Sequence, residues 1–231
     1  MKLIKNSIAI NYNNSDVKEV NESIIKDKII KIEINGEKYG TFAVIDDSLK
    51  EFTIGYLFGE NLVQSLDEVE SIDISTEKIA VSVKNMNKKD NIKKVESTLE
   101  VTAEELVSRM DSLTENAESW QKTGGTHVAG IVYKDEFIVK EDVSRHVAVD
   151  KVIGCGILNN YDLNECYIIY SGRMPANMVK KLANNNIPLL VSNAAPMASG
   201  IDYGKKSNVT LVGFLRGKRF NVYTNPERIL F

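Results

Sequence analysis

The sequence predicts an α/β fold, and the order of segments in its last third carries that prediction. Apolar, strand-like runs alternate there with helix-like segments that open with proline, a residue favoured in the first turn of a helix. A strand–helix–strand–helix–strand order produces parallel strands joined by right-handed crossovers. The segments, in order, are CYIIYS (166–171), PANMVKKLANNN (175–186), IPLLVS (187–192), PMASGIDYGKKSN (196–208) and VTLVGF (209–214), with one more strand expected in 219–229.

The middle of the chain predicts a helix, then two paired strands, then a second helix. Thr102 is a candidate N-cap, Glu105 completes a capping box with it, and Val101 and Leu106 fit a hydrophobic staple. Apolar residues then recur at spacings of four and three, which places on one helical face Leu106, Met110, Leu113, Ala117 and Trp120. The paired strands are expected at 127–133 and 136–142, and the second helix at 147–158.

The first hundred residues predict a smaller α+β unit. Two strand-like runs within 28–44 flank Asn35-Gly36, the strongest short signal for a β-hairpin. Ser48 and Glu51 have the spacing of a capping box for a helix over 49–63, and a second hairpin is expected over 69–84. We therefore predict two domains, a small α+β domain over 1–100 and an α/β domain over 101–231.

Composition and charge exclude several classes of protein. The chain has 231 residues, a net charge of −3 and 43% apolar residues, values typical of globular proteins without a general affinity for nucleic acid. It has no apolar run of the ~20 residues that a membrane span needs and no signal-peptide pattern. The two cysteines, Cys155 and Cys166, form no disulfide framework, so a cytoplasmic location is expected.

Small, polar and basic residues follow the predicted parallel strands, and ligands of open α/β sheets gather at that edge. Ser171, Gly172 and Arg173 follow the first strand, and the small polar run 192–195 follows the second. After the third come Phe214, Leu215, Arg216, Gly217, Lys218 and Arg219. Arginine binds phosphate through a bidentate fork, so these cations predict a phosphate or pyrophosphate site. The alternative is a solvated basic rim.

Both histidines of the chain lie in polar strings. His127 follows Gly124, Gly125 and Thr126, a run whose backbone N–H groups could cradle an anion, although a glycine pair is also typical of a simple turn. The second string runs from 141 to 146. In it, Asp142 could cap a helix or orient a histidine, Arg145 could hold an anion, and His146 could line the same pocket; a local cap and ion-pair cluster is the alternative.

Metal and hydrolase chemistry are not expected. A zinc deaminase needs a glutamate two residues after its histidine and a PCxxC motif, but Ala129 follows His127 at that spacing and no PCxxC occurs. The GxSxG elbow of a serine hydrolase is also missing. Cys155 and Cys166 lie in apolar segments, where a free cysteine is typically a small inert hydrophobe.

Taken together, the motifs resemble the FdhD/NarQ family of formate dehydrogenase accessory proteins. The similar strings, in family order, are IEINGEKYGTFAV, TGGTHVAG, EDVSRHVAVDKVIG, SGRMPANMVKK, IPLLVSNAAP and VTLVGFLRGKRFNVYTNPERI. The resemblance implies a cytidine-deaminase-like three-layer αβα domain without zinc, and a homodimer. It also implies sulfur transfer from a cysteine desulfurase to the bis-molybdopterin guanine dinucleotide cofactor of formate dehydrogenase. The family's cofactor-binding stretch matches 214–219, where GDP would mimic the cofactor.

One departure from the family pattern affects the expected activity. The family's CxxC should lie in 84–106, and that lysine-rich region contains no cysteine, while Ser144 stands where the family has glycine. The first hypothesis is an accessory protein that binds and delivers the molybdenum or tungsten cofactor; the second is a sulfurtransferase with Cys155 or Cys166 as substitute carrier. The third is a diverged nucleotide-binding or regulatory module. Whether the lysines of 84–94 dock a partner stays open.

Overall fold

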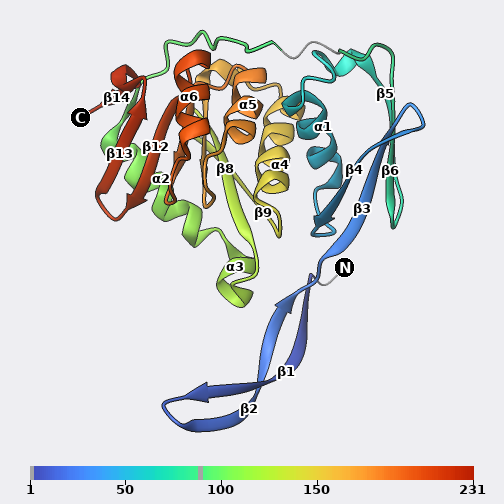
Figure 1. Cartoon of the computed structure of the whole chain (residues 1–231), viewed down its shortest axis with the longest axis vertical. Coiled ribbons are helices and arrows are strands. Elements are labelled where there is room, and N and C mark those ends of the chain that lie inside the picture. Colours follow the sequence, from blue (N-terminus) through green and yellow to red (C-terminus); the bar gives the residue numbers. More distant parts are fainter. Residues whose placement is uncertain (1–2, 88–90) are drawn as a thin grey trace.

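The computed structural model describes residues 3–87 and 91–231, in which helices cover a central sheet and an arm projects from the body (Figure 1). The helices are α1 (Leu49–Gly59), α2 (Ala103–Glu115), α3 (Glu118–Thr123), α4 (Arg145–Leu158), α5 (Ala176–Asn184) and α6 (Ala198–Ser207). The strands of the first half are β1 (Ile4–Asn13), β2 (Asp16–Ile25), β3 (Lys28–Ile34), β4 (Glu37–Val44), β5 (Val69–Ile74) and β6 (Lys78–Val83). Those of the second half are β7 (Val101–Thr102), β8 (His127–Tyr133), β9 (Glu136–Asp142), β10 (Cys166–Tyr170), β11 (Leu189–Ser192), β12 (Thr210–Arg216), β13 (Arg219–Thr224) and β14 (Ile229–Leu230).

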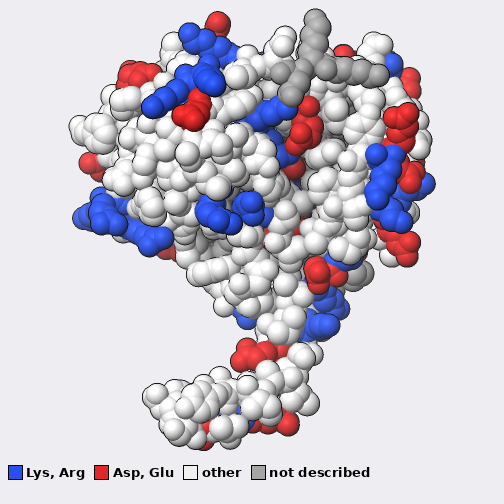
Figure 2. All heavy atoms as spheres, viewed as in Figure 1, with Lys and Arg blue, Asp and Glu red and all other residues white. Residues whose placement is uncertain are grey.

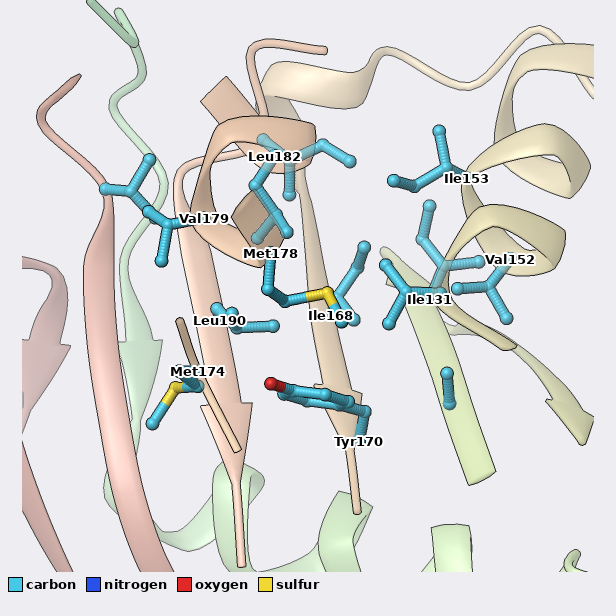
Figure 3. Packing of buried hydrophobic residues seen from close by; sticks show 14 of the residues in the cluster. Ile131, Val152, Ile153, Ile168, Tyr170, Met174, Met178, Val179, Leu182 and Leu190 are labelled. Atoms are coloured by element: carbon cyan, nitrogen blue, oxygen red, sulfur yellow. The ribbon is translucent and has the colours of Figure 1, made fainter. Parts of the chain in front are cut away.

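The central sheet has six strands in the order β13-β12-β11-β10-β8-β9. Strands β10, β11 and β12 are parallel, with α5 and α6 in the crossovers, as the alternation of segments predicts. Apolar side chains of α4 and α5 pack on one face of this sheet, where Val152, Met178 and Leu182 meet Ile168 and Leu190 (Figure 3). Residues of α2 cover the other face. The predicted α/β class is confirmed; the deaminase-like sub-fold stays a prediction.

A second sheet, of order β4-β3-β6-β5, lies within the first hundred residues and packs on α1. The predicted hairpins β3–β4 and β5–β6 are both present. Asn35 and Gly36 have φ values of 51° and 83°, the positive φ values that a two-residue type I′ turn requires. Val147 of α4 belongs to the same apolar cluster, so this sheet and the larger domain share buried side chains. The predicted boundary near residue 100 stays a prediction.

Helices α1 and α4 approach each other through two glycines. A Cβ atom on Gly55 would lie 1.8 Å from the backbone oxygen of Asp150, and one on Gly154 would lie 1.9 Å from that of Glu51. Any side chain at either position would therefore collide with the facing backbone. This close contact fixes α1 against the middle of α4.

Three details of the predicted helices are wrong. Ser48 has φ 52° and makes no side-chain cap bond, because its hydroxyl donates to Asp47 and accepts from Lys140 instead. The predicted long helix ends at Glu115, so Trp120 lies on the separate helix α3 and is 42% exposed rather than buried. Both prolines precede their helices, Pro175 as the N-cap of α5 and Pro196 one residue before the N-cap of α6. The Thr102 cap is confirmed: its Oγ1 accepts from the N–H of Glu105 at 3.1 Å.

The projecting arm is an antiparallel hairpin of β1 and β2 that the sequence interpretation missed (Figure 1). Its tip turns at Asn14 and Ser15, which have φ values of 46° and 72°. Cross-strand register puts Ile8, Ile10, Tyr12 and Val17 on one face, and each of these side chains is more than half exposed. The arm therefore presents to solvent a face rich in apolar side chains, although their cross-strand partners Glu19 and Asn21 lie on the same face. No helix within the described residues is long and apolar enough to cross a membrane.

Candidate functional site

The loops at the carboxyl ends of β10, β11 and β12 are hydrogen-bonded into one surface. The N–H of Met174 donates to the carbonyl of Ala195 (3.1 Å), and that of Phe214 donates to Ala194 (3.1 Å). The Arg216 Nε donates to the carbonyl of Asn193 (3.0 Å). These bonds bring together the three strand ends that the sequence predicts as a site.

A cavity of about 260 Å³ opens at this edge, between the sheet and helices α2 and α3. Its lining residues are Met110, Leu113, Thr114, Ala117, Trp120, Thr126, His127, Val128, Ser171 and Asn193. One side of this strand-end pocket is apolar, while Thr126, His127, Ser171 and Asn193 offer polar groups. Such a mixed surface suits an organic ligand with a few fixed polar contacts. The pocket includes three predicted site residues: Thr126, His127 and Ser171.

Both histidines and Arg145 reach the same edge of the sheet. Because β8 runs antiparallel to β10, His127 at the start of β8 lies beside the end of β10, where the Ser171 N–H donates to the Val128 carbonyl. Arg145 and His146 form the first turn of α4, directly after β9. A Cβ atom on Gly172 would lie 3.2 Å from both Cβ and Cδ of Arg145, so the guanidinium stem passes against this glycine.

The charges of this cluster favour an anion. The Arg145 Nε is buried and has no hydrogen-bond partner within the described part of the chain. Burial and the nearby Arg145 lower the pKa of His127. Burial, then Lys181 and Arg145, lower the pKa of His146 to about 4. Both imidazoles are therefore neutral at pH 7, and the Nε–H of the cationic Arg145 is a buried donor without a partner, although neither Arg145 nor His146 is among the residues that line the cavity.

Asp142 does not orient a histidine. Its carboxylate is fully buried, lies 2.7 Å from Lys151 Nζ, and accepts N–H bonds from Ile45 and Ser144 at 3.1 Å each. The Lys151 Nζ also donates to the carbonyl of Glu141 (3.1 Å). Asp142 thus ties the start of α4 to Ile45, beside β4, and has no exposed oxygen for a ligand.

The glycine pair after α3 forms a helix end. Gly124 has φ 62°, and its N–H donates to the Trp120 carbonyl at 2.7 Å, as in a left-handed helix cap. The Gly125 N–H donates to Thr123 Oγ1 at 3.1 Å. Both N–H groups are engaged within the turn, so the anion cradle proposed for this run lacks its two glycine donors.

The residues of the basic stretch 214–219 do not all face the strand-end pocket. Leu215 is 1% exposed and belongs to the core, and Lys218 lines a separate hollow over the outer face of α2. Arg216, Lys218 and Arg219 form the blue cluster at the tip of the β12–β13 hairpin, where Gly217 has φ 56° (Figure 2). Phe214 has φ 54° within a β-bulge, which turns its side chain out of the strand's regular alternation. Of these three cations, Arg216 is the one bonded to the rim of the strand-end pocket, at Asn193; Arg173 is exposed, three residues after the end of β10.

Neither cysteine is placed for thiol chemistry. Cys155, in α4, is 6% exposed, and burial raises its thiol pKa to about 11. Cys166, at the start of β10, is 0% exposed, and burial raises its thiol pKa to about 12. A persulfide carrier needs an accessible thiolate of lowered pKa, and both thiols have the opposite properties.

The segment in which the resemblance predicts a CxxC is tied to the opposite edge of the sheet. Part of the lysine-rich stretch, 88–90, lies outside the described residues. After it, the buried Val95 donates its N–H to the Ser207 carbonyl (2.8 Å) and accepts from the Asn208 side chain (2.9 Å). Ser207 ends α6, so this segment crosses the amino ends of the parallel strands, as Figure 1 shows.

Comparison with known proteins places the chain among relatives of similar length. The "Sulfur carrier protein FdhD" of Methanothermobacter thermautotrophicus is 40% identical over 92% of this chain and 94% of that protein. The "Protein FdhD" of Methanocaldococcus jannaschii is 32% identical over 93% of both. A crystal structure of a putative formate dehydrogenase accessory protein from Desulfotalea psychrophila matches with a TM-score of 0.87 at 26% identity, over 99% of this chain and 100% of that one.

The family comparison covers nearly the whole chain. The model of the FdhD/NarQ family matches residues 25–96 and 85–230, which include the second sheet, the strand-end pocket and the basic hairpin. Among the described residues, no group of three or more His, Cys, Asp or Glu side chains is placed to hold a metal ion. Sequence, fold and relatives agree, and the chain belongs to the FdhD/NarQ family.

Proposed function

We propose that this protein is a formate dehydrogenase accessory protein that binds the guanine-dinucleotide end of the molybdenum or tungsten cofactor and delivers the cofactor to the apoenzyme. The observation that carries the proposal is the buried, unpartnered Nε of Arg145, at the same sheet edge as a pocket rimmed by Arg216. The name of the similar crystal structure, which refers to a formate dehydrogenase accessory protein, supports this role over that of a diverged regulatory module.

The size of the pocket limits what enters it. A cavity of about 260 Å³ is smaller than the roughly 300–1,000 Å³ typical of drug-sized ligands. The proposal therefore places no more than one nucleoside end of the cofactor in the cavity, with the phosphates toward Arg216 at the rim and Arg145 at the same edge of the sheet. The pterin and the metal are cargo outside this pocket, and GDP is a suitable probe of the nucleotide end.

Calorimetric titration with GDP tests the proposal. We expect Arg145→Ala and Arg216→Ala each to weaken GDP binding roughly 10- to 100-fold, because a hydrogen bond to a charged group contributes about 1.5–3 kcal/mol. Lys218→Ala is the matched control. It removes a cation from the same hairpin, but the Lys218 side chain faces α2 rather than the pocket. Binding that is absent from the wild type, or equally strong in all four proteins, would refute the site.

Sulfur transfer by these thiols is not part of the proposal. After incubation with a cysteine desulfurase and cysteine, we expect intact-protein mass spectrometry to show no added sulfur on Cys155 or Cys166, because both thiols are buried and protonated at neutral pH. The same experiment in denaturant, where both thiols are exposed, is the positive control for reactivity. A mass gain of one sulfur on the folded protein would restore the sulfurtransferase hypothesis.

The homodimer also remains a proposal. It rests on the resemblance, and the apolar face of the arm supports it, because an isolated two-stranded hairpin is marginally stable in water and such a face is normally covered. A cytoplasmic location is likewise proposed from the resemblance. Direct contact with a cysteine desulfurase is not required when neither thiol accepts sulfur.

A further inference from the structure

One wall of the strand-end pocket is a helix that the core does not hold. α3 has six residues, none of them buried, and its N-cap, Ala117, has no side chain able to cap it. Trp120, the only tryptophan of the chain, lies on α3 and lines the pocket. Core packing holds the N-cap residue Ala117, which is 0% exposed, but the six residues of α3 depend on other contacts for their position.

Glu141 supplies the missing cap from the neighbouring strand. One carboxylate oxygen of Glu141 accepts from the Ser119 N–H at 2.8 Å, and the other accepts from the Trp120 N–H at 2.7 Å. The first N–H groups of a helix have no partner within the helix, and the Glu141 carboxylate accepts hydrogen bonds from two of them in α3. The sequence marks no such role, because the partners lie 21 and 22 positions apart.

The same carboxylate also holds the exit of the segment. The Thr126 hydroxyl donates to Glu141 Oε2 at 2.6 Å, and Thr126 is 8% exposed. Glu141 pairs with Val128 across β8 and β9, so its backbone is fixed by the central sheet. One side chain therefore closes the loop from Ser119 to Thr126 and sets where Trp120 and His127 face the pocket.

Support from the arm is steric only. A Cβ atom on Gly125 would lie 2.9 Å from Cγ2 of Ile25, at the base of β2, so the turn rests against the arm. This contact limits how far α3 can move toward the arm, and among the described residues the arm makes no hydrogen bond to this turn. Glu141 is thus the polar anchor at the start of α3 and at Thr126, while the Gln121 side chain of α3 donates to the carbonyls of Thr114 and Glu115 at the end of α2 (2.8 and 3.0 Å).

We propose that Glu141 is a positioning residue of the strand-end pocket. Its carboxylate presets α3 and the Thr126–His127 segment, so that a nucleotide meets a formed wall rather than one that must order on binding. This inference rests on the proposed nucleotide binding. Ordering a loop on binding reduces affinity by the free energy of that ordering. Because Glu141 orders the loop beforehand, this cost is avoided.

Glu141→Gln tests the inference, because glutamine keeps the size of the side chain but replaces one acceptor oxygen with a donor. We expect acrylamide quenching of Trp120 fluorescence to increase in the ligand-free variant and GDP binding to weaken about fivefold. Glu136→Gln is the matched control: it lies on the same strand, where its carboxylate accepts from Tyr161 at the far end from the pocket. Both readouts should stay at wild-type values in that control.

The outcomes separate this inference from the proposed function. If wild-type protein does not bind GDP, the nucleotide proposal fails, while increased quenching in Glu141→Gln still establishes that Glu141 positions α3. Unchanged quenching, or increased quenching with unchanged GDP affinity, overturns the inference. If Glu141→Gln does not fold, Thr126→Val removes only one of the three bonds and gives the same pair of readouts.

Discussion

Lys151→Met is expected to lower the free energy of unfolding by about 3–5 kcal/mol, the typical result of removing one partner of a buried ion pair. The side chains of Lys151 and Asp142 are both 0% exposed and 2.7 Å apart. Without the ammonium group, the Asp142 carboxylate keeps only two backbone N–H donors, Ile45 and Ser144. Urea denaturation followed by circular dichroism at pH 7 measures the loss.

The pH dependence of this variant gives a second signature. Burial already raises the pKa of Asp142, with Lys151 opposing the shift, so removing Lys151 raises this pKa further. A carboxyl group with a raised pKa binds more protons when folded than when unfolded, so its contribution to stability increases as pH falls. The deficit of Lys151→Met should therefore be smaller at pH 5 than at pH 7.

Lys205→Met is the control for that prediction. Lys205 is exposed on α6, and its replacement should change the free energy of unfolding by less than about 0.5 kcal/mol. A loss below about 1 kcal/mol for Lys151→Met, or a deficit that grows as pH falls, would contradict the assignment of a buried, charged pair.

Gly154→Ala is expected to destabilise the fold by about 2 kcal/mol. Alanine favours helix over glycine by about 1 kcal/mol, so without the facing helix this substitution would stabilise α4. The new Cβ, however, would lie 1.9 Å from the backbone oxygen of Glu51, and backbone cannot move aside as a side chain can. Overpacking of this kind costs typically 1–3 kcal/mol and here exceeds the gain in propensity.

Thermal and urea unfolding of Gly154→Ala and Gly55→Ala measure this effect, and the two glycines should behave alike because each faces the other helix's backbone. Ser108→Ala, at an exposed position of α2, reports the effect of helix propensity alone. Equal or higher stability in Gly154→Ala would show that α1 and α4 are not in close contact.

Local signals in the sequence predict much of this fold. The Asn35-Gly36 turn, the Thr102 cap and the alternation through 166–214 each depend on neighbouring residues, and the structure has all three. The arm was missed because β1 and β2 bury almost nothing, and an exposed hairpin with mixed polarity leaves no clear periodic pattern. Trp120 fits the helical spacing of α2 but lies beyond its end.

The candidate site was predicted as a sheet edge but not in its internal contacts. Strand topology brings His127, Arg145 and Ser171 together, which the order of segments implies. The roles of Asp142 and Glu141 could not be predicted, because their partners are set by tertiary contacts with Lys151 and α3. Leu215 and Lys218 show the same limit, since the bulge at Phe214 and the turn at Gly217 decide which side chains face the pocket.

The central claim is that the strand-end pocket binds the nucleotide end of the cofactor, and a crystal structure of the protein with GDP tests it most directly. We expect the guanosine in the cavity beside Trp120 and His127 and a phosphate oxygen within hydrogen-bond distance of Arg145 Nε, with Arg216 at the rim. GDP bound elsewhere with this pocket empty, or a pocket ligand that leaves the Arg145 Nε without a partner, would contradict the account.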